Sequence, residues 1–159
     1  MNDLIRSIIA YAFIIGVIIG GFWFYKTSTK ATVDSADSYM NIEHFKPGSS
    51  YAVDNSITSV KDLVQGDVVA YFLPGEPDVH KIGRVVAIEG QLVEANPTFV
   101  KVDRKTVTIF KSDARELIIP EIRIPKNCVW VMADRTTLAK DSMHIGPVPF
   151  FNIMGKVKY

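Results

Sequence analysis

The first feature to explain is a long uncharged stretch near the start of the chain. Residues 7–25, SIIAYAFIIGVIIGGFWFY, are mostly aliphatic or aromatic and carry no charge. A helix of roughly 20 apolar residues crosses the hydrocarbon core of a bilayer. Aromatic residues such as those at 22–25 commonly mark the membrane interface. We therefore expect a transmembrane anchor at 7–25, preceded by a short tail of residues 1–6.

A cleaved signal peptide is the alternative interpretation of this run. Signal peptides usually have an apolar core of about 7–15 residues and end at small residues, whereas this run is longer and ends in bulky rings. Arg6 lies on one side and Lys26 and Lys30 on the other, so charge alone does not orient the anchor. Because the tail is short, we place it in the cytoplasm, which leaves most of the chain extracytoplasmic in a single-pass protein.

Overall composition excludes some classes of function. The chain has 18 Lys and Arg against 17 Asp and Glu, and it lacks the concentrated basic stripe of a nucleic-acid-binding protein. A single cysteine permits no intramolecular disulfide and leaves the compartment open. The histidines, at positions 44, 80 and 144, lack the spacing of metal ligands. We predict neither a metal nor a cofactor.

The remainder of the chain divides into a linker and a β domain. Residues 26–38 are small and polar, which is typical of a linker, and the domain occupies residues 39–159. Short β-branched or aromatic runs bounded by Gly, Pro and Asp predict strands at 50–54, 67–73, 81–88, 98–103, 106–111 and 129–132. Residues 103–105 predict a hairpin, and 113–117 and 136–141 predict short helical turns. We expect a mostly β, antiparallel domain closed as a barrel or sandwich.

Two segments, 66–91 and 125–159, carry a more specific pattern. The first contains Gly66-Asp67-Val-Val and, further on, Ile-x-Arg84-Val-Val. The second contains Val-Met-x-Asp134, followed by the sequence Asp141-Ser142 and by Gly146. In order and spacing these blocks resemble the signatures of type I signal peptidases, the membrane-anchored Ser/Lys proteases that remove export signals. The resemblance implies a signal-peptidase-like β fold and an extended substrate added to a sheet edge.

The departures from the family pattern concern the catalytic residues. The family's general base is a lysine directly before the arginine, and that position is Gly83 here. Aligning Pro47 with the proline of the family's serine motif places His44 at the nucleophile position, or Phe45 or Lys46 after a small shift. The resemblance therefore predicts a catalytically inactive relative. We expect Gly83 and Gly48 to leave the floor of the cleft roomier.

Two enzymatic alternatives remain. The first is an active signal peptidase with a relocated Ser/Lys pair. It would use Lys81, which lies on the same strand face as Gly83, together with Ser38, Ser49 or Ser50. The second is a sortase-type transpeptidase built on Cys128, Arg135 and His144, although a cysteine that opens an apolar strand is more often packed than reactive.

The Asp141-Ser142 pair occupies the family element that supports the lysine base, with Met143 in place of an arginine. Without a base to orient, the pair is expected to organise the loop that opens with Asp134. Similar degenerate signal-peptidase-like proteins accompany sortase-assembled pili of Gram-positive bacteria. By resemblance, we expect a chaperone or assembly factor at the cell surface, with pilin subunits or the pilus sortase as partners. Oligomeric state is not predicted.

Overall fold

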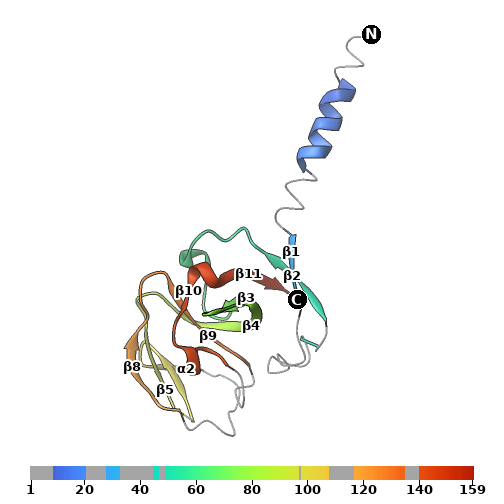
Figure 1. The fold of residues 1–159 in the computed structure, drawn as a ribbon. Coiled ribbons are helices and arrows are strands. Elements are labelled where there is room, and N and C mark those ends of the chain that lie inside the picture. Colours follow the sequence, from blue (N-terminus) through green and yellow to red (C-terminus); the bar gives the residue numbers. More distant parts are fainter. Residues whose placement is uncertain are drawn as a thin grey trace.

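Alternating apolar side chains build two antiparallel sheets in the computed structural model (Figure 1). The structure describes residues 9–20, 28–32, 45–46, 49–96, 98–107, 117–134 and 140–159. In the larger, seven-stranded sheet the strand order is β1-β2-β11-β3-β4-β9-β10, and in the smaller, four-stranded sheet it is β7-β6-β5-β8. Neither order returns to its first strand, so the expected barrel closure is wrong for the described residues. The predicted mostly β, antiparallel class is confirmed.

The strands of the larger sheet are β1 (Ser28–Thr32), β2 (Ser50–Asp54), β3 (Val68–Leu73), β4 (Glu76–Ile88), β9 (Cys128–Met132), β10 (Val148–Pro149) and β11 (Ile153–Lys158). Those of the smaller sheet are β5 (Leu92–Ala95), β6 (Val100–Val102), β7 (Lys105–Val107) and β8 (Ile119–Arg123). Short helical turns are η2 (Val60–Asp62), α2 (Ser142–Ile145) and η3 (Phe150–Asn152). β1 lies within the segment expected to be a linker and pairs with β2.

The predicted hairpin at 103–105 is confirmed. β6 and β7 pair in register from Val100↔Val107 to Val102↔Lys105. Asp103 and Arg104 lie between them with φ angles of 48° and 66°. Positive φ at both central residues is the geometry of a tight hairpin turn that matches the twist of its strands.

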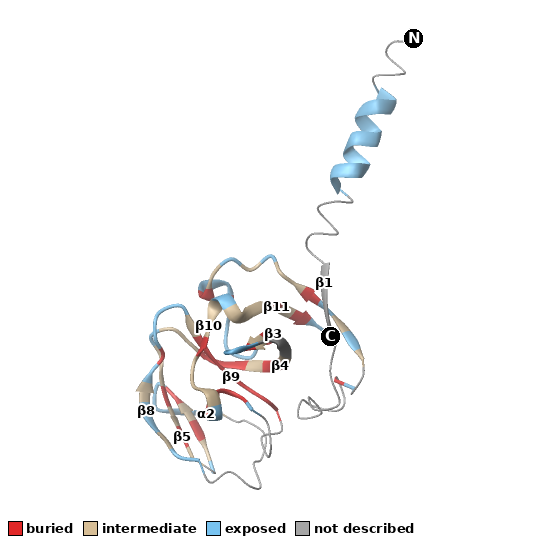
Figure 2. Ribbon diagram, in the orientation of Figure 1, coloured by how far each residue is buried: buried red, intermediate tan, exposed pale blue. Residues whose placement is uncertain are grey.

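Three apolar clusters hold the sheets together, and Figure 2 shows the buried residues concentrated along the central strands. One cluster, which we call the first core, contains Phe45, Val53, Val68, Ala70, Ile82, Ala133 and Val157. On the opposite face of β3 and β4, a second core includes Val69, Tyr71, Val85 and Val131. A third core between the two sheets includes Trp130 and Ile124. Alternate residues of β4 therefore face different cores.

Residues 9–20 form a helix whose side chains are all exposed, and in Figure 1 it lies apart from the sheets. Among its exposed side chains are Tyr11, Phe13 and several isoleucines. In the part of the chain that the structure describes, no helix is both long and apolar enough to span a membrane. The predicted anchor at 7–25 extends beyond the described helix at both ends.

Candidate active site

The position of the family's lysine is occupied by a tightly packed glycine. Gly83 lies on β4 opposite Val69 of β3. A Cβ atom on Gly83 would lie 2.5 Å from Val131 Cγ1, 3.2 Å from Tyr71 Cε1 and 3.3 Å from the Met132 carbonyl oxygen. The expectation of a roomier floor at Gly83 is therefore wrong, because the side chains of Val131 and Tyr71 fill that space. Gly48, the other expected contributor, lies outside the described residues.

Lys81 lies two residues before Gly83 and is half-buried. It stands opposite Tyr71 in the β3–β4 ladder. Because side chains alternate along a strand, Lys81 projects from the face to which Gly83 belongs, whereas Ile82 between them enters the first core. The lysine stem therefore runs beside a buried aromatic ring at the border of the second core.

One edge of β4 beside Lys81 has no neighbouring strand among the described residues. β3 pairs with β4 from Arg84 back to Glu76. On its other side β4 pairs with β9 only from Arg84 to Ile88. Within the described part of the chain, no strand adds to residues 76–83 on that side. An extended peptide could pair there through its main chain, as in β-strand addition.

An ion pair lies on β4 directly after Gly83. Arg84 Nε and Nη2 donate to the two carboxylate oxygens of Asp134 at 2.7 and 2.8 Å. Arg84 Nη1 also donates to the carbonyl of Gly66 at 2.9 Å. The hydrogen bond to Asp134 raises the pKa of the guanidinium above its already high ordinary value, although burial opposes this. Charge-assisted, bidentate pairs of this kind set geometry as well as energy.

Gly66 and Asp67 close the turn that leads into β3. The Gly66 amide donates to the Val85 carbonyl and the Val85 amide donates to the Asp67 carbonyl, both at 2.8 Å. Gly66 has a φ of 100°, a region that favours glycine. The Asp67 carboxylate pairs with Lys156 at 2.9 Å. The structure thus brings together Gly66, Asp67, Arg84 and Asp134, which the sequence motifs had singled out separately.

Asp141 and Ser142 bind the edge of β9. The amide of Val131 donates to Ser142 Oγ at 2.9 Å, and the amide of Ala133 donates to Asp141 Oδ2 at 3.1 Å. Asp141 also caps α2 by accepting from the Met143 amide at 3.0 Å. Gly146 ends α2 with a φ of 77°. Both polar side chains thus accept hydrogen bonds from backbone amides that would otherwise be buried without an acceptor.

The segment expected to carry the nucleophile is only partly described. His44 and Ser38 lie outside the described residues. Phe45 is buried in the first core, and Ser50 begins β2. Two strands, β11 and β3, separate β2 from β4, so about three strand spacings, roughly 14 Å, lie between Ser50 and the strand of Lys81. That separation disfavours Ser50 as the partner of Lys81.

The described residues give no geometric support to the sortase-like alternative. Burial raises the pKa of the Cys128 thiol, and the negative charge of Glu89 raises it further. A reactive cysteine needs the opposite shift, toward the thiolate. His144 instead lies 3.8 Å from Asp141, and Arg135 is outside the described residues.

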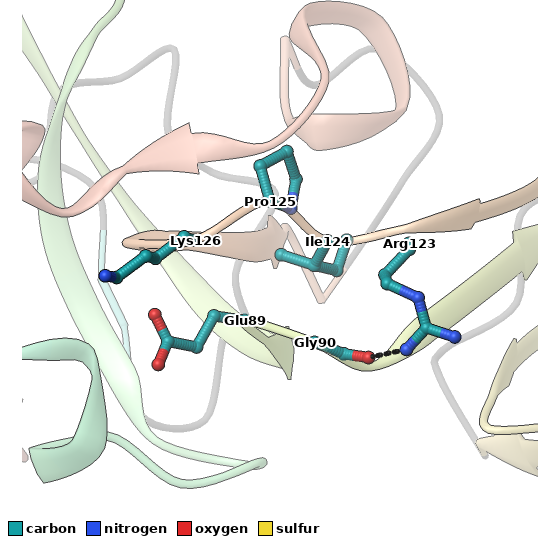
Figure 3. A pocket seen from close by; sticks show the side chains of 6 residues that line it. All are labelled: Glu89, Gly90, Arg123, Ile124, Pro125 and Lys126. Atoms are coloured by element: carbon teal, nitrogen blue, oxygen red, sulfur yellow. Dashed lines mark hydrogen bonds between the residues drawn. The ribbon is translucent and has the colours of Figure 1, made fainter.

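A separate pocket of about 440 Å³ lies where the two sheets connect (Figure 3). Its lining residues are Glu89, Gly90, Arg123, Ile124, Pro125 and Lys126. Arg123 donates to the Gly90 carbonyl at 2.6 Å, and Glu89 accepts from the Asn127 amide at 2.8 Å. None of the residues expected to carry the chemistry lines this pocket, so it is distinct from the candidate active site.

Sequence reasoning missed two tyrosines. Tyr51 and Tyr159 both contact Phe45, with ring centroids 5.1 and 4.8 Å apart. The signal available in the sequence was aromatic spacing, since Phe45 and Tyr51 flank the expected nucleophile segment. The contact with Tyr159 joins positions too distant for any local pattern to reveal.

The site thus combines a β4 edge to which no described strand is paired, a half-buried lysine and a bidentate ion pair. The family model "Signal peptidase, peptidase S26" matches residues 2–159. The chain belongs to this family.

One relative and one solved structure can be compared in more detail. The mitochondrial ATP-independent inner membrane protease subunit 1b of Arabidopsis thaliana is 34% identical over 93 residues, which make up 58% of this chain and 47% of the relative. The chain thus aligns with about half the length of that relative. A crystal structure of a signal peptidase I from Enterococcus faecalis V583 aligns with 65% of this chain and 100% of its own, at 14% identity and a TM-score of 0.49.

These findings correct the prediction of a non-enzyme. The family is named for peptidases, and the Arabidopsis relative is named a protease subunit. The prediction of inactivity rested on Gly83 at the lysine position and His44 at the serine position, and it kept a base relocated to Lys81 only as the alternative. Lys81 lies on the same face of the same strand, so a glycine at position 83 does not by itself show that the chain lacks a base.

Proposed function

We propose that this chain is a membrane-associated serine endopeptidase that cleaves export signals from pre-proteins, with Lys81 as general base. The observation that carries the proposal is the position of Lys81. It is half-buried on β4, beside an edge to which no described strand is paired. A peptide added at that edge would run past the lysine. Membership of the signal peptidase family supports the reaction and the substrate class.

A lysine acts as a base only in its neutral form, which an apolar setting favours. The stem of Lys81 lies next to Tyr71, which is 2% exposed. Binding of a substrate strand over the open edge would exclude water from the same place. Ser49 is the immediate neighbour of Ser50, at a Cα distance of about 3.8 Å, so both lie far across the sheet from Lys81. The nucleophile is therefore assigned to Ser38, which lies outside the described residues.

Attachment to the membrane is part of the proposal. The exposed apolar side chains of residues 9–20 support a single-pass anchor at 7–25, with the sheets outside the cytoplasm. The Arabidopsis relative is named an inner membrane protein, which agrees with such an anchor. A pilin or a pilus sortase stays a predicted partner, supported by resemblance alone. Crosslinking in cells, with the partner identified by mass, tests that prediction, and recovery of neither protein would contradict it.

Cleavage of a purified pre-protein with an A-x-A site tests the enzymatic role. The full chain in detergent should release the mature product, and Lys81→Ala should abolish release. Lys81→Arg is the sharper variant, because arginine keeps the positive charge but does not lose its proton near neutral pH. Lys101, a half-buried strand lysine paired with Glu94 in the smaller sheet, provides the matched control. Lys101→Ala should cleave at the wild-type rate.

The same assay assigns the nucleophile. Ser38→Ala is compared with Ser49→Ala and Ser50→Ala, and only Ser38→Ala is expected to be inactive. Activity that survives all three substitutions would overturn the proposed Ser/Lys mechanism. Equal activity of the wild-type chain, Lys81→Ala and Lys81→Arg would remove Lys81 from it.

A further inference from the structure

Three residues that follow His44, the expected nucleophile position, are held in place by aromatic contacts of the first and by hydrogen bonds of the other two. We call Phe45, Lys46 and Ser49 the anchored segment. Phe45 is 1% exposed, and its ring packs against Tyr51 at a centroid distance of 5.1 Å and against Tyr159 at 4.8 Å. Both contacts are tilted, at 52° and 54°, and tilted rings at such distances attract one another beyond simple burial.

Hydrogen bonds transmit this anchoring along the backbone. The Lys46 amide donates to the Tyr51 hydroxyl at 2.8 Å. The Ser49 amide donates to the Lys46 carbonyl at 3.1 Å. A displacement of Phe45 would therefore move the Lys46 peptide and, through it, Ser49.

Tyr159 connects the anchored segment to the central strands of the larger sheet. The residue follows β11, which lies between β2 and β3 in the larger sheet. Its side chain is 60% exposed, yet its ring covers one side of the buried Phe45. β3, the strand beside β11, pairs in turn with β4, the strand that carries Lys81.

We propose that Tyr159 is a positioning residue of the peptidase, which holds the anchored segment at a fixed place relative to β4. This inference rests on the proposed function, because it assumes that the anchored segment sets the position of a nucleophile that precedes it in the chain. Misplacement of a reacting group by about 1 Å can lower a rate roughly a hundredfold. A ring contact that fixes Phe45 therefore has a kinetic consequence without touching the substrate.

The test compares Tyr159→Leu with Tyr159→Phe in the full chain. Leucine removes the aromatic contact with Phe45, whereas phenylalanine restores it and removes only the hydroxyl. Phe151→Leu is the matched control, because Phe151 is 85% exposed and lies in η3. Two readouts are taken: hydrogen–deuterium exchange at the amides of Lys46 and Ser49, and the kcat and KM for cleavage of an A-x-A pre-protein.

Tyr159→Leu should speed exchange at Lys46 and Ser49 several-fold while the amides of β5 and β6 exchange as before. Its kcat should fall about tenfold to a hundredfold with KM little changed. Tyr159→Phe should restore both readouts, and Phe151→Leu should change neither. Unchanged exchange in Tyr159→Leu, a loss confined to KM, or equal losses in the Leu and Phe variants would overturn the inference.

Failure of the proposed function has a different signature. In that case the wild-type chain itself would not cleave the pre-protein. The exchange measurement then decides the positioning role alone, since it depends on the contacts and not on turnover.

Discussion

Substitution of Gly83 by alanine should destabilise the protein, although alanine usually suits a strand better than glycine. The added Cβ would lie 2.5 Å from Val131 Cγ1, about 1 Å closer than the roughly 3.5–4.0 Å of an ordinary carbon contact. Val131 is fully buried and has nowhere to rotate without displacing its neighbours. Such overpacking costs about 1–3 kcal/mol. Alanine also reduces the conformational freedom of the unfolded chain, which stabilises the fold by about 0.4–1 kcal/mol. The free energy of unfolding should therefore fall by about 1–2 kcal/mol in total.

A second substitution isolates the contact responsible. Val131→Ala alone should cost about 1.5 kcal/mol or more, because two buried carbon groups are lost at about 0.8 kcal/mol each. In Gly83→Ala/Val131→Ala the new Cβ occupies part of the space that the valine vacates. The double variant should therefore be more stable than the sum of the single changes predicts, with a coupling energy of about 1 kcal/mol.

The assay is urea unfolding of the full chain in detergent, followed by tryptophan fluorescence, with the midpoint and the slope determined for all four proteins. An unchanged slope is required for the midpoints to be compared as stability. Two results would refute the reasoning. Gly83→Ala could be as stable as the wild-type protein, or the two substitutions could prove additive. Either result would mean that position 83 has room for a side chain.

Other substitutions probe the ion pair, a carboxylate and the β9 edge. Asp134→Asn should lose roughly 3 kcal/mol by leaving Arg84 partly buried without its counter-charge, at the low end because the Arg84 side chain is 26% exposed; an unfolding midpoint equal to wild type would contradict this. The pKa of Asp54 is lowered to about 2, mainly by hydrogen bonds from Ser56, so its contribution to stability should be complete above about pH 4 and be lost as pH falls through about 2. The difference in unfolding midpoint between wild type and Asp54→Asn should accordingly shrink as the pH falls from about 4 to about 2. A constant difference would contradict the lowered pKa of Asp54. Ser142→Ala should lower the free energy of unfolding by about 1–3 kcal/mol, because the buried Val131 amide loses its acceptor. An unchanged melting temperature in calorimetry would contradict this prediction.

Local sequence patterns predicted the strands whose limits are set by local turns. The run at 50–54 coincides with β2, and the hairpin after β6 follows from the polar residues 103–105 between two alternating runs. β11 was not predicted, although it lies between β2 and β3. Gly155 within it breaks the apolar pattern, and its backbone approaches the Asp54 carbonyl so closely that a Cβ would collide with that group. The need for glycine there comes from a neighbour strand that the local sequence does not reveal.

The same limit applies to the candidate site. Arg84 and Asp134 were each recognised by motif, but their pairing spans 50 positions and depends on how β4 meets β9. Gly83 was interpreted as vacant space because a glycine has no side chain. Whether a neighbour fills that space is a property of packing, and here Val131 fills it. Inactivity was inferred from Gly83 and from His44 at the nucleophile position, although the strand presents a lysine two residues before Gly83.

The most direct test of the account is the intact mass of an A-x-A pre-protein after incubation with the wild-type chain and with Lys81→Arg. We predict that the wild-type chain releases the mature product with a new amino terminus directly after the A-x-A site. Lys81→Arg should leave the pre-protein intact while unfolding at the same urea concentration as the wild-type chain. No product from the wild-type chain, or equal product from both proteins, would contradict the assignment of Lys81 as the base of a signal-cleaving endopeptidase.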